Sequence, residues 1–112
     1  MSAGFVNDIN GILIWNPVPA KGETVHWSGP AQGGYANGEG LLTWYHNKKE
    51  VSSYQGYMKR GKPDGFGIYK FADGDIYAGE WRSGLRHGSG KHWFKDGRFY
   101  SGTWENDKRV SG

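Results

Sequence analysis

The sequence lacks cysteine altogether, which excludes disulfide bonds, thiolate zinc sites and a cysteine nucleophile. It also lacks any apolar run near the roughly 18 residues that a membrane-spanning helix requires. Residues 1–8 contain neither a basic segment nor an apolar stretch, so we expect no secretory signal there. These absences predict a protein that is cytoplasmic or peripheral to a membrane, and they leave open export with a signal that has been removed.

A large excess of charge of one sign is also missing, since 14 Lys and Arg residues stand against 11 Asp and Glu residues. The distribution is uneven along the chain. Residues 1–53 carry three basic and four acidic side chains, whereas residues 54–112 carry eleven basic and seven acidic ones. This mild basic bias of the second half permits an anionic partner without requiring one.

Glycine and aromatic residues are abundant, with 20 and 18 residues respectively in a chain of 112. So many aromatic rings provide more buriable surface than a disordered chain has. Long helices are disfavoured because glycine costs about 1 kcal/mol relative to alanine at each helical position. A chain of this length corresponds to one domain, which we expect to be a sheet with many tight turns.

The chain repeats itself with a period of 23 residues, and residues 54–76 align with residues 77–99 at eight positions. The aligned residues are Tyr54, Gly56, Gly61, Gly65, Gly67, Phe71, Asp73 and Gly74 in the first unit, and Tyr77, Gly79, Gly84, Gly88, Gly90, Phe94, Asp96 and Gly97 in the second. Fixed-period similarity of this kind marks an array of structural repeats.

Incomplete units flank these two repeats. Residues 100–112 form a terminal half repeat, and residues 27–53 form a degenerate repeat with four extra residues near its closing turn. Residues 10–26 form a half repeat with a lead-in. Residues 1–9 are expected to act as an N-terminal arm or cap, because repeat arrays need capping at their ends. The prediction is a single domain over residues 1–112.

Each unit is interpreted as a β-hairpin, because the residue pattern alternates with a period of two. Asp73-Gly74 and Asp96-Gly97 are strong hairpin-turn dipeptides. The connections at residues 59–64 and 82–87 are expected to be longer solvent loops. Strand glycines share a face with the aromatic residues, where a ring can lie across the neighbouring backbone. The predicted fold is all-β: an elongated, single-layer antiparallel β-meander built from hairpins of 23 residues.

The spacing Tyr-x-Gly-x-(Trp/Tyr)-x-x-Gly-x-x-x-Gly-x-Gly-x-x-x-Phe-x-Asp-Gly resembles the MORN repeat (membrane occupation and recognition nexus) over roughly residues 10–107. Residues 22–29 and 34–40 are similar to the start of bacterial members of this family. The resemblance implies an elongated β-meander with an aromatic-lined groove. It also implies binding and scaffolding: attachment to membranes or anionic lipids, cytoskeletal organisation, dimerisation, or gripping of a partner protein.

Aromatic residues of the repeats line one face of the predicted sheet, and no second sheet or helix is predicted to cover them. They are Tyr54, Phe71, Tyr77, Trp81, Phe94, Tyr100 and Trp104. Either these rings pack only on glycine and on each other, or part of the face is open to a partner, since exposed apolar surface and Tyr and Trp residues mark interaction sites. The main hypothesis is a non-enzymatic scaffold that binds a protein partner, or a second copy of itself, through this face.

Basic residues of the loops form a second candidate surface. They are Lys59, Lys62, Arg82, Arg86, Lys108 and Arg109. Equivalent side chains recur about every 10 Å along one edge of a meander, and each cation contributes about 1 kcal/mol near an anionic membrane. Peripheral binding to anionic phospholipid is therefore the alternative function, although acidic residues in the same loops favour a merely solvated edge. Nucleic acid is disfavoured as a partner, since the aromatic residues belong to the repeat itself.

A catalytic or metal site is not expected. The serines have no Asp–His pair spaced to activate them, and His87 and His92 are predicted to lie on opposite faces of one strand. Asp73 and Asp75 superficially resemble a calcium loop, but the downstream bidentate glutamate is missing. We predict no catalytic residue, no metal ligand and no cofactor, and an enzyme site in the aromatic groove is the least supported hypothesis.

Overall fold

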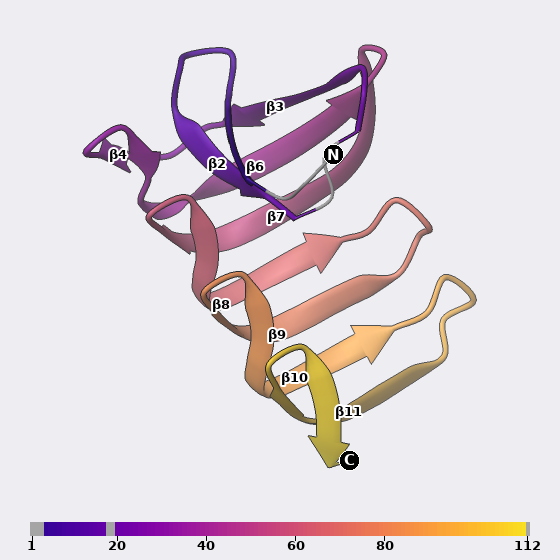
Figure 1. Ribbon diagram of the computed structural model, residues 1–112. Coiled ribbons are helices and arrows are strands. Elements are labelled where there is room, and N and C mark those ends of the chain that lie inside the picture. The colour runs from indigo at the N-terminus through magenta and orange to yellow at the C-terminus, as the bar shows by residue number, and fades with distance from the viewer. Residues whose placement is uncertain (1–3, 18–19, 112) are drawn as a thin grey trace.

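The computed structural model describes residues 4–17 and 20–111 as a stack of hairpins (Figure 1). These residues form twelve strands and contain no helix. The all-β class and the antiparallel meander predicted from the sequence are confirmed.

Eight strands form the main sheet, in the order β12-β11-β10-β9-β8-β7-β6-β3. Their bounds are β3 Glu23–Trp27, β6 Gly38–His46, β7 Lys49–Lys59, β8 Lys62–Lys70, β9 Ile76–Arg82, β10 Leu85–Trp93, β11 Phe99–Glu105 and β12 Lys108–Ser111. All neighbouring pairs are antiparallel, and from β6 to β12 each strand pairs with the next one along the chain.

Two kinds of turn connect these strands. At one edge, a hairpin turn lies where the Asp73-Gly74 dipeptide predicted one: the Gly74 N–H donates a hydrogen bond to the Phe71 carbonyl at 3.1 Å, and Gly74 has a φ of 99°. At the opposite edge, which we call the tip edge, the predicted longer loop at residues 59–64 is wrong. There β7 and β8 remain paired to their ends, which leaves only Arg60 and Gly61 in the turn. Their φ angles of 50° and 82° suit a two-residue hairpin turn.

A row of glycines crosses six strands of the main sheet. Successive Cα partners along this row are Gly40, Gly56, Gly67, Gly79, Gly90 and Gly102. A Cβ atom built on Gly79 would lie 2.5 Å from the Cα of Gly90 and 2.7 Å from the hydroxyl of Tyr77. The strand glycines therefore make room for aromatic rings and for the adjacent backbone, and we call the face that carries these rings the inner face.

A second sheet of four strands covers the N-terminal end of the inner face (Figure 1). Its strands are, in spatial order, β1 Gly4–Asn7, β2 Leu13–Asn16, β5 Tyr35–Ala36 and β4 Ala31–Gln32. Ile14 and Ala36 are fully buried and belong to the same hydrophobic core as Trp27, Trp44 and Tyr54 of the main sheet. The sequence did not predict this layer, because β2 and β5 pair in parallel across a long sequence separation.

The first strand of this second sheet belongs to the predicted N-terminal arm. Phe5 packs edge-on against Trp15 and Tyr35, with ring centroids 5.2 and 5.1 Å away. Residues 1–3 of the predicted arm lie outside the described residues. The described part of the arm therefore packs on the domain itself.

Asp8 connects the second sheet to the main sheet. Its carboxylate accepts hydrogen bonds from the backbone N–H groups of Asn10, Ile12 and Trp27 at 2.8, 2.9 and 3.0 Å. Desolvation by burial raises the pKa of Asp8, but the hydrogen bonds outweigh it, so the pKa lies below its ordinary value of 3.8. The ionised carboxylate is therefore the form that the fold stabilises.

Asp8→Asn is expected to lower the free energy of unfolding by about 2 kcal/mol near neutral pH, because a charged acceptor of three backbone donors is lost. In the wild type, the contribution of Asp8 is present above its unfolded pKa of 3.8 and is lost as the pH falls through the lowered folded pKa. Urea unfolding at neutral pH and at about pH 2 measures both effects. The Asn variant should lose less stability on acidification than the wild type does.

The exposed residue Glu105 provides a control, since Glu105→Gln should change stability by less than about 0.5 kcal/mol. Equal acid responses of the wild type and Asp8→Asn would contradict the role assigned to Asp8.

Candidate functional site

The inner face of the main sheet holds a continuous ladder of aromatic rings. The ring of Tyr77 lies edge-to-face with those of Trp81 and Trp104, with centroids 5.2 and 5.0 Å away. The hydroxyl of Tyr54 donates a hydrogen bond to the carbonyl of Tyr57 at 2.7 Å. The contact between Tyr77 and Trp104 joins β9 to β11, so the ladder links neighbouring hairpins, whereas the other two contacts lie within β9 and within β7.

Burial keeps the phenols of this ladder protonated. It raises the pKa of Tyr54 and of Tyr69, and it raises the pKa of Tyr77 to about 12. The carboxylate of Asp64 raises the pKa of Tyr54 further. These tyrosines are therefore uncharged packing groups near neutral pH.

The seven aromatic residues predicted to bind a partner fall into two groups. Four are buried: Tyr54, Tyr77, Trp81 and Trp104. The other three, Phe71, Phe94 and Tyr100, are partly exposed, and we call them the open aromatic patch. A partner that approaches the folded protein reaches only these three rings, and their role in binding stays a prediction.

His92 lies on the same face, and its stacking there was not predicted from the sequence. Its ring is parallel to that of Tyr100 within 3°, at a centroid distance of 5.4 Å, and it also stacks on Phe71. Its Nε2 atom lies 3.0 Å from a carboxylate oxygen of Asp75. The signal in the sequence was the repeat itself, because His92 stands 23 residues after Tyr69.

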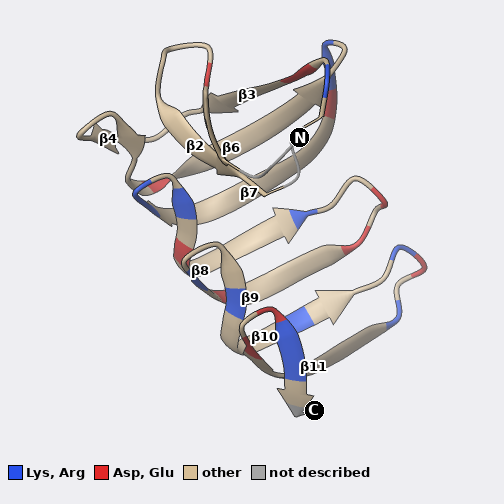
Figure 2. Cartoon of the chain, viewed as in Figure 1, with Lys and Arg blue, Asp and Glu red and all other residues tan. Residues whose placement is uncertain are grey.

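Arginine side chains lie over several of these rings. The guanidinium of Arg109 is 4.1 Å from the ring centroid of Tyr100, and that of Arg98 is 5.3 Å from the centroid of Phe94. Arg98 also forms an ion pair with Asp96 at 2.7 Å. Figure 2 shows where the charged residues lie along the hairpins. The open aromatic patch is therefore bordered by cations.

The basic residues that were predicted to form one stripe are divided between two places. Arg86 and Arg109 lie over the rings of Tyr77 and Tyr100, and Arg86 is paired with Asp107 at 2.7 Å. The other four are near the tip edge: Lys59, Lys62, Arg82 and Lys108. The side chain of Lys62 lies over the ring of Trp15 at 4.3 Å. All six residues stand beside the tip turns in the chain, but Arg86 and Arg109 direct their side chains over rings, and the role of the six in binding an anionic partner stays a prediction.

Two clefts open along the tip edge. The larger has a volume of about 790 Å³ and lies between the β4–β5 and β7–β8 hairpins. The smaller has a volume of about 470 Å³ and lies between the β7–β8 and β9–β10 hairpins. Lys59, Asp64 and Gly65 line both clefts, so the two are continuous.

No group of three or more metal-binding side chains is found within residues 4–17 and 20–111. The part of the chain that the structure describes also has no helix with the length and apolar character needed to cross a membrane.

Comparison with protein families finds a match to the MORN repeat at residues 54–76, 77–97 and 100–110. These segments correspond to β7–β8, β9–β10 and β11–β12 of the main sheet. Comparison with curated proteins finds no match.

Proposed function

Because this chain belongs to the MORN-repeat family, we propose that it is a non-enzymatic binding module that holds a protein partner, or a second copy of itself, at the open aromatic patch. The proposal concerns Phe71, Phe94 and Tyr100, because the other rings of the ladder are buried. MORN repeats are generally non-catalytic, which is consistent with a binding role.

The observation that carries the proposal is the difference between the two ends of the inner face. Over β3, β6 and β7 the second sheet covers the rings, whereas over β8 to β11 the described residues provide no second layer (Figure 1). Rings of Phe and Tyr with arginine beside them are typical of protein interfaces, where aromatic residues and arginine are enriched.

A direct test compares Tyr100→Ala with Phe99→Ala. The two residues are neighbours on β11, so their side chains point to opposite faces of the sheet, and Phe99 is itself 57% exposed. Proteins captured from the source cell by the wild-type chain would be identified by mass spectrometry, and self-association would be measured by sedimentation. Tyr100→Ala is expected to weaken the interaction about tenfold, and Phe99→Ala to leave it unchanged.

Thermal unfolding of both variants verifies that they are folded under the conditions of the binding assay. Equal affinities of the wild type and Tyr100→Ala, with no self-association of either, would contradict the proposal.

Anionic phospholipid is the second candidate partner, favoured by the exposed cations Lys59 and Arg82 at the tip edge. Vesicles that contain phosphatidylserine distinguish the two functions. Lipid binding should vanish at high ionic strength and in the Lys59→Ala/Arg82→Ala variant, since exposed charges are screened by salt. Absence of binding at low salt would eliminate this candidate.

A further inference from the structure

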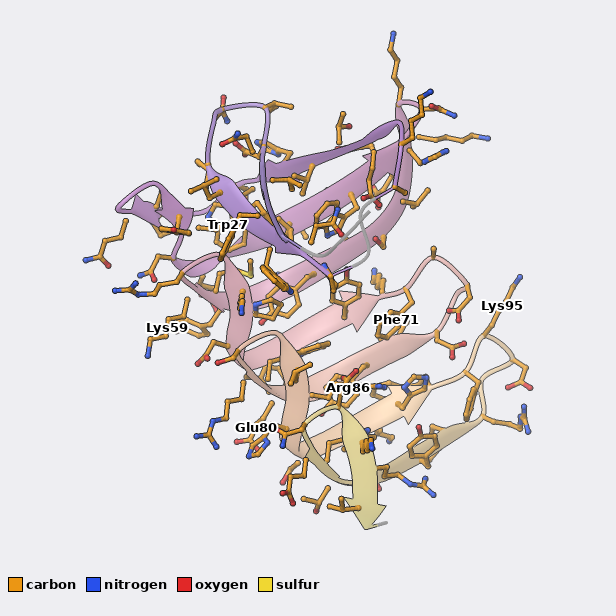
Figure 3. The ribbon with its side chains drawn as sticks, viewed as in Figure 1. Trp27, Lys59, Phe71, Glu80, Arg86 and Lys95 are labelled. Carbon is orange, nitrogen blue, oxygen red and sulfur yellow. The ribbon has the colours of Figure 1, made fainter. Side chains whose placement is uncertain are left out.

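The two continuous clefts of the tip edge form a groove that is separate from the open aromatic patch. We call it the tip groove and define it by the exposed side chains of Tyr57, Lys59, Phe66 and Arg82. Figure 3 shows Lys59 at this edge, away from Phe71 on the inner face. The groove runs from hairpin to hairpin, across the strands.

The tip groove repeats with the period of the array. Lys59 in the larger cleft and Arg82 in the smaller one are 23 residues apart and occupy equivalent positions at the ends of β7 and β9. One repeat contributes two strands, and neighbouring strands are about 4.8 Å apart. The two cations are therefore offset by about 10 Å along the groove.

Hydrogen bonds between successive tips hold the groove in shape. The Gly61 N–H donates to the Ala36 carbonyl, and the Gly84 N–H donates to the Pro63 carbonyl, both at 2.8 Å. The Ser83 N–H donates to the Asp64 carboxylate at 3.1 Å. A groove ordered in this way loses little conformational freedom when a ligand binds.

The polar groups of the groove favour an anionic ligand. The carboxylate of Asp64 is engaged by the Ser83 N–H, and that of Glu80 accepts a hydrogen bond from the Ser89 N–H at 2.8 Å. Neither Lys59 nor Arg82 takes part in an ion pair among the described residues. Asp64 and Glu80 keep their negative charge, but the lining of the two clefts also holds the three cations Lys59, Arg60 and Arg82, so positive charge is in excess in the groove.

Two exposed rings add apolar surface to the groove. Tyr57 is 50% exposed in the larger cleft, and Phe66 is 58% exposed in the smaller one. Gly65 separates them, and an atom placed at its Cβ position would lie 3.5 Å from the Cβ of Tyr57. These rings do not recur in the next repeat, where Glu80 and Ser89 stand at the equivalent positions. A ligand suited to the groove therefore combines carboxylates with apolar groups that reach these two rings.

We propose that the tip groove binds a proline-rich peptide in the polyproline II conformation that carries an acidic side chain at every third residue. This helix has three residues per turn and a rise of about 3.1 Å per residue, so side chains three residues apart point in one direction about 9.3 Å from each other. That distance matches the offset between Lys59 and Arg82. Proline rings at the intervening positions pack on Tyr57 and Phe66, as they do in other aromatic-lined grooves.

An extended β-strand fits less well, because its side chains on one face recur at about 6.6 Å, every second residue. A flat anionic membrane would reach the exposed cations, but it would not enter the clefts. The spacing of the cations and the hollow shape therefore both favour the polyproline II peptide.

The test uses a fluorescent peptide of repeated Pro-Pro-Glu triplets, with anisotropy as the readout. A second peptide of the same composition has its glutamates placed next to one another. The triplet peptide should bind at least tenfold more tightly than the rearranged one. Lys59→Ala/Arg82→Ala should weaken its binding about tenfold, which is the sum expected for two exposed charge pairs. Tyr57→Ala should weaken it severalfold.

Matched controls come from the opposite edge of the sheet. Lys49→Ala/Lys95→Ala removes two exposed cations there, and Phe99→Ala removes an exposed ring, and neither change should alter binding of the triplet peptide. Thermal unfolding verifies that all variants are folded. Equal binding of the two peptides would overturn the proposal. A second result would also overturn it: the triplet peptide does not bind, while phosphatidylserine vesicles bind the wild type and not the Lys59→Ala/Arg82→Ala variant. That result would assign the two cations to a lipid surface.

Discussion

Gly79→Ala is expected to lower the free energy of unfolding by about 3 kcal/mol or more. A Cβ atom at this position would lie 2.5 Å from the Cα of Gly90, 2.6 Å from the carbonyl oxygen of Ser89 and 2.7 Å from the hydroxyl of Tyr77. Two of these three contacts are to backbone, which cannot turn aside as a flexible side chain can. The strands of the repeat must separate, and overpacking of this kind costs up to several kcal/mol. Urea unfolding at neutral pH measures the loss.

Alanine substitutions at two other glycines distinguish the effect of steric crowding from that of backbone strain. A Cβ atom on Gly4 meets nothing within 4 Å, so Gly4→Ala should change stability by less than about 0.5 kcal/mol. Gly97 also has open space, but its φ of +95° is unfavourable for alanine, which should cost about 1–2 kcal/mol. The loss of stability is therefore expected to be largest for Gly79→Ala, smaller for Gly97→Ala and smallest for Gly4→Ala. A Gly79→Ala variant as stable as the wild type would contradict the packing of rings on the glycine row.

Tyr77→Ala is expected to destabilise the protein by about 3–5 kcal/mol, the range for removal of a large buried aromatic side chain. Tyr77 has no exposed surface, and its ring contacts those of Trp81 and Trp104 from two other positions of the ladder. Tyr77→Phe keeps these ring contacts and loses only a hydrogen bond to the carbonyl of Glu80, which is long at 3.4 Å. It should cost about 1 kcal/mol.

The same residue is expected to make the fold sensitive to alkali. Burial raises the pKa of Tyr77 to about 12, above the ordinary value of 10.0. The contribution of the protonated phenol is therefore fully present below pH 10 and is lost as the pH rises towards 12. Tyr77→Phe should reduce the loss of stability over this interval, as measured by urea unfolding and by tyrosinate absorbance. A loss below about 1 kcal/mol for Tyr77→Ala would show that the ring is not part of the core.

Substitutions of buried rings of the ladder affect folding as well as any binding. Tyr77 and Trp81 were predicted to contact a partner, yet both are buried, so alanine at either position tests the fold before it tests an interface. Tyr100 and Phe94 are partly exposed and lie beside arginine side chains, which makes them the informative positions for binding.

Sequence reasoning succeeded where the relevant contacts are local. The Asp73-Gly74 turn and the hairpin that it closes depend on residues only a few positions apart. It failed at the opposite edge, where Arg60 and Gly61 form a two-residue turn in place of the longer loop that was expected. Composition there suggested a solvent loop, but pairing of the flanking strands continues to the turn.

Contacts between residues that are distant in the chain could not be predicted from the sequence. Asp8 binds the N–H of Trp27, nineteen residues away, and no repeat position or motif marks this bond. The sequence did not predict the partners of His92, whereas the fold stacks it between Phe71 and Tyr100 and places it beside Asp75. Each of these arrangements depends on the pairing of strands across the sheet.

The sequence by itself determined the period of the array, its hairpins and the shared face of glycine and aromatic residues. These follow from alternation along one strand and from the conformational freedom of glycine at turns. Only the tertiary structure decided which rings are covered and which of the loop cations lie over rings. The physical reason is that both depend on contacts between distant parts of the chain. The second sheet folds back over β3, β6 and β7, and the side chains of Arg86 and Arg109 lie over the rings of Tyr77 and Tyr100 on other strands.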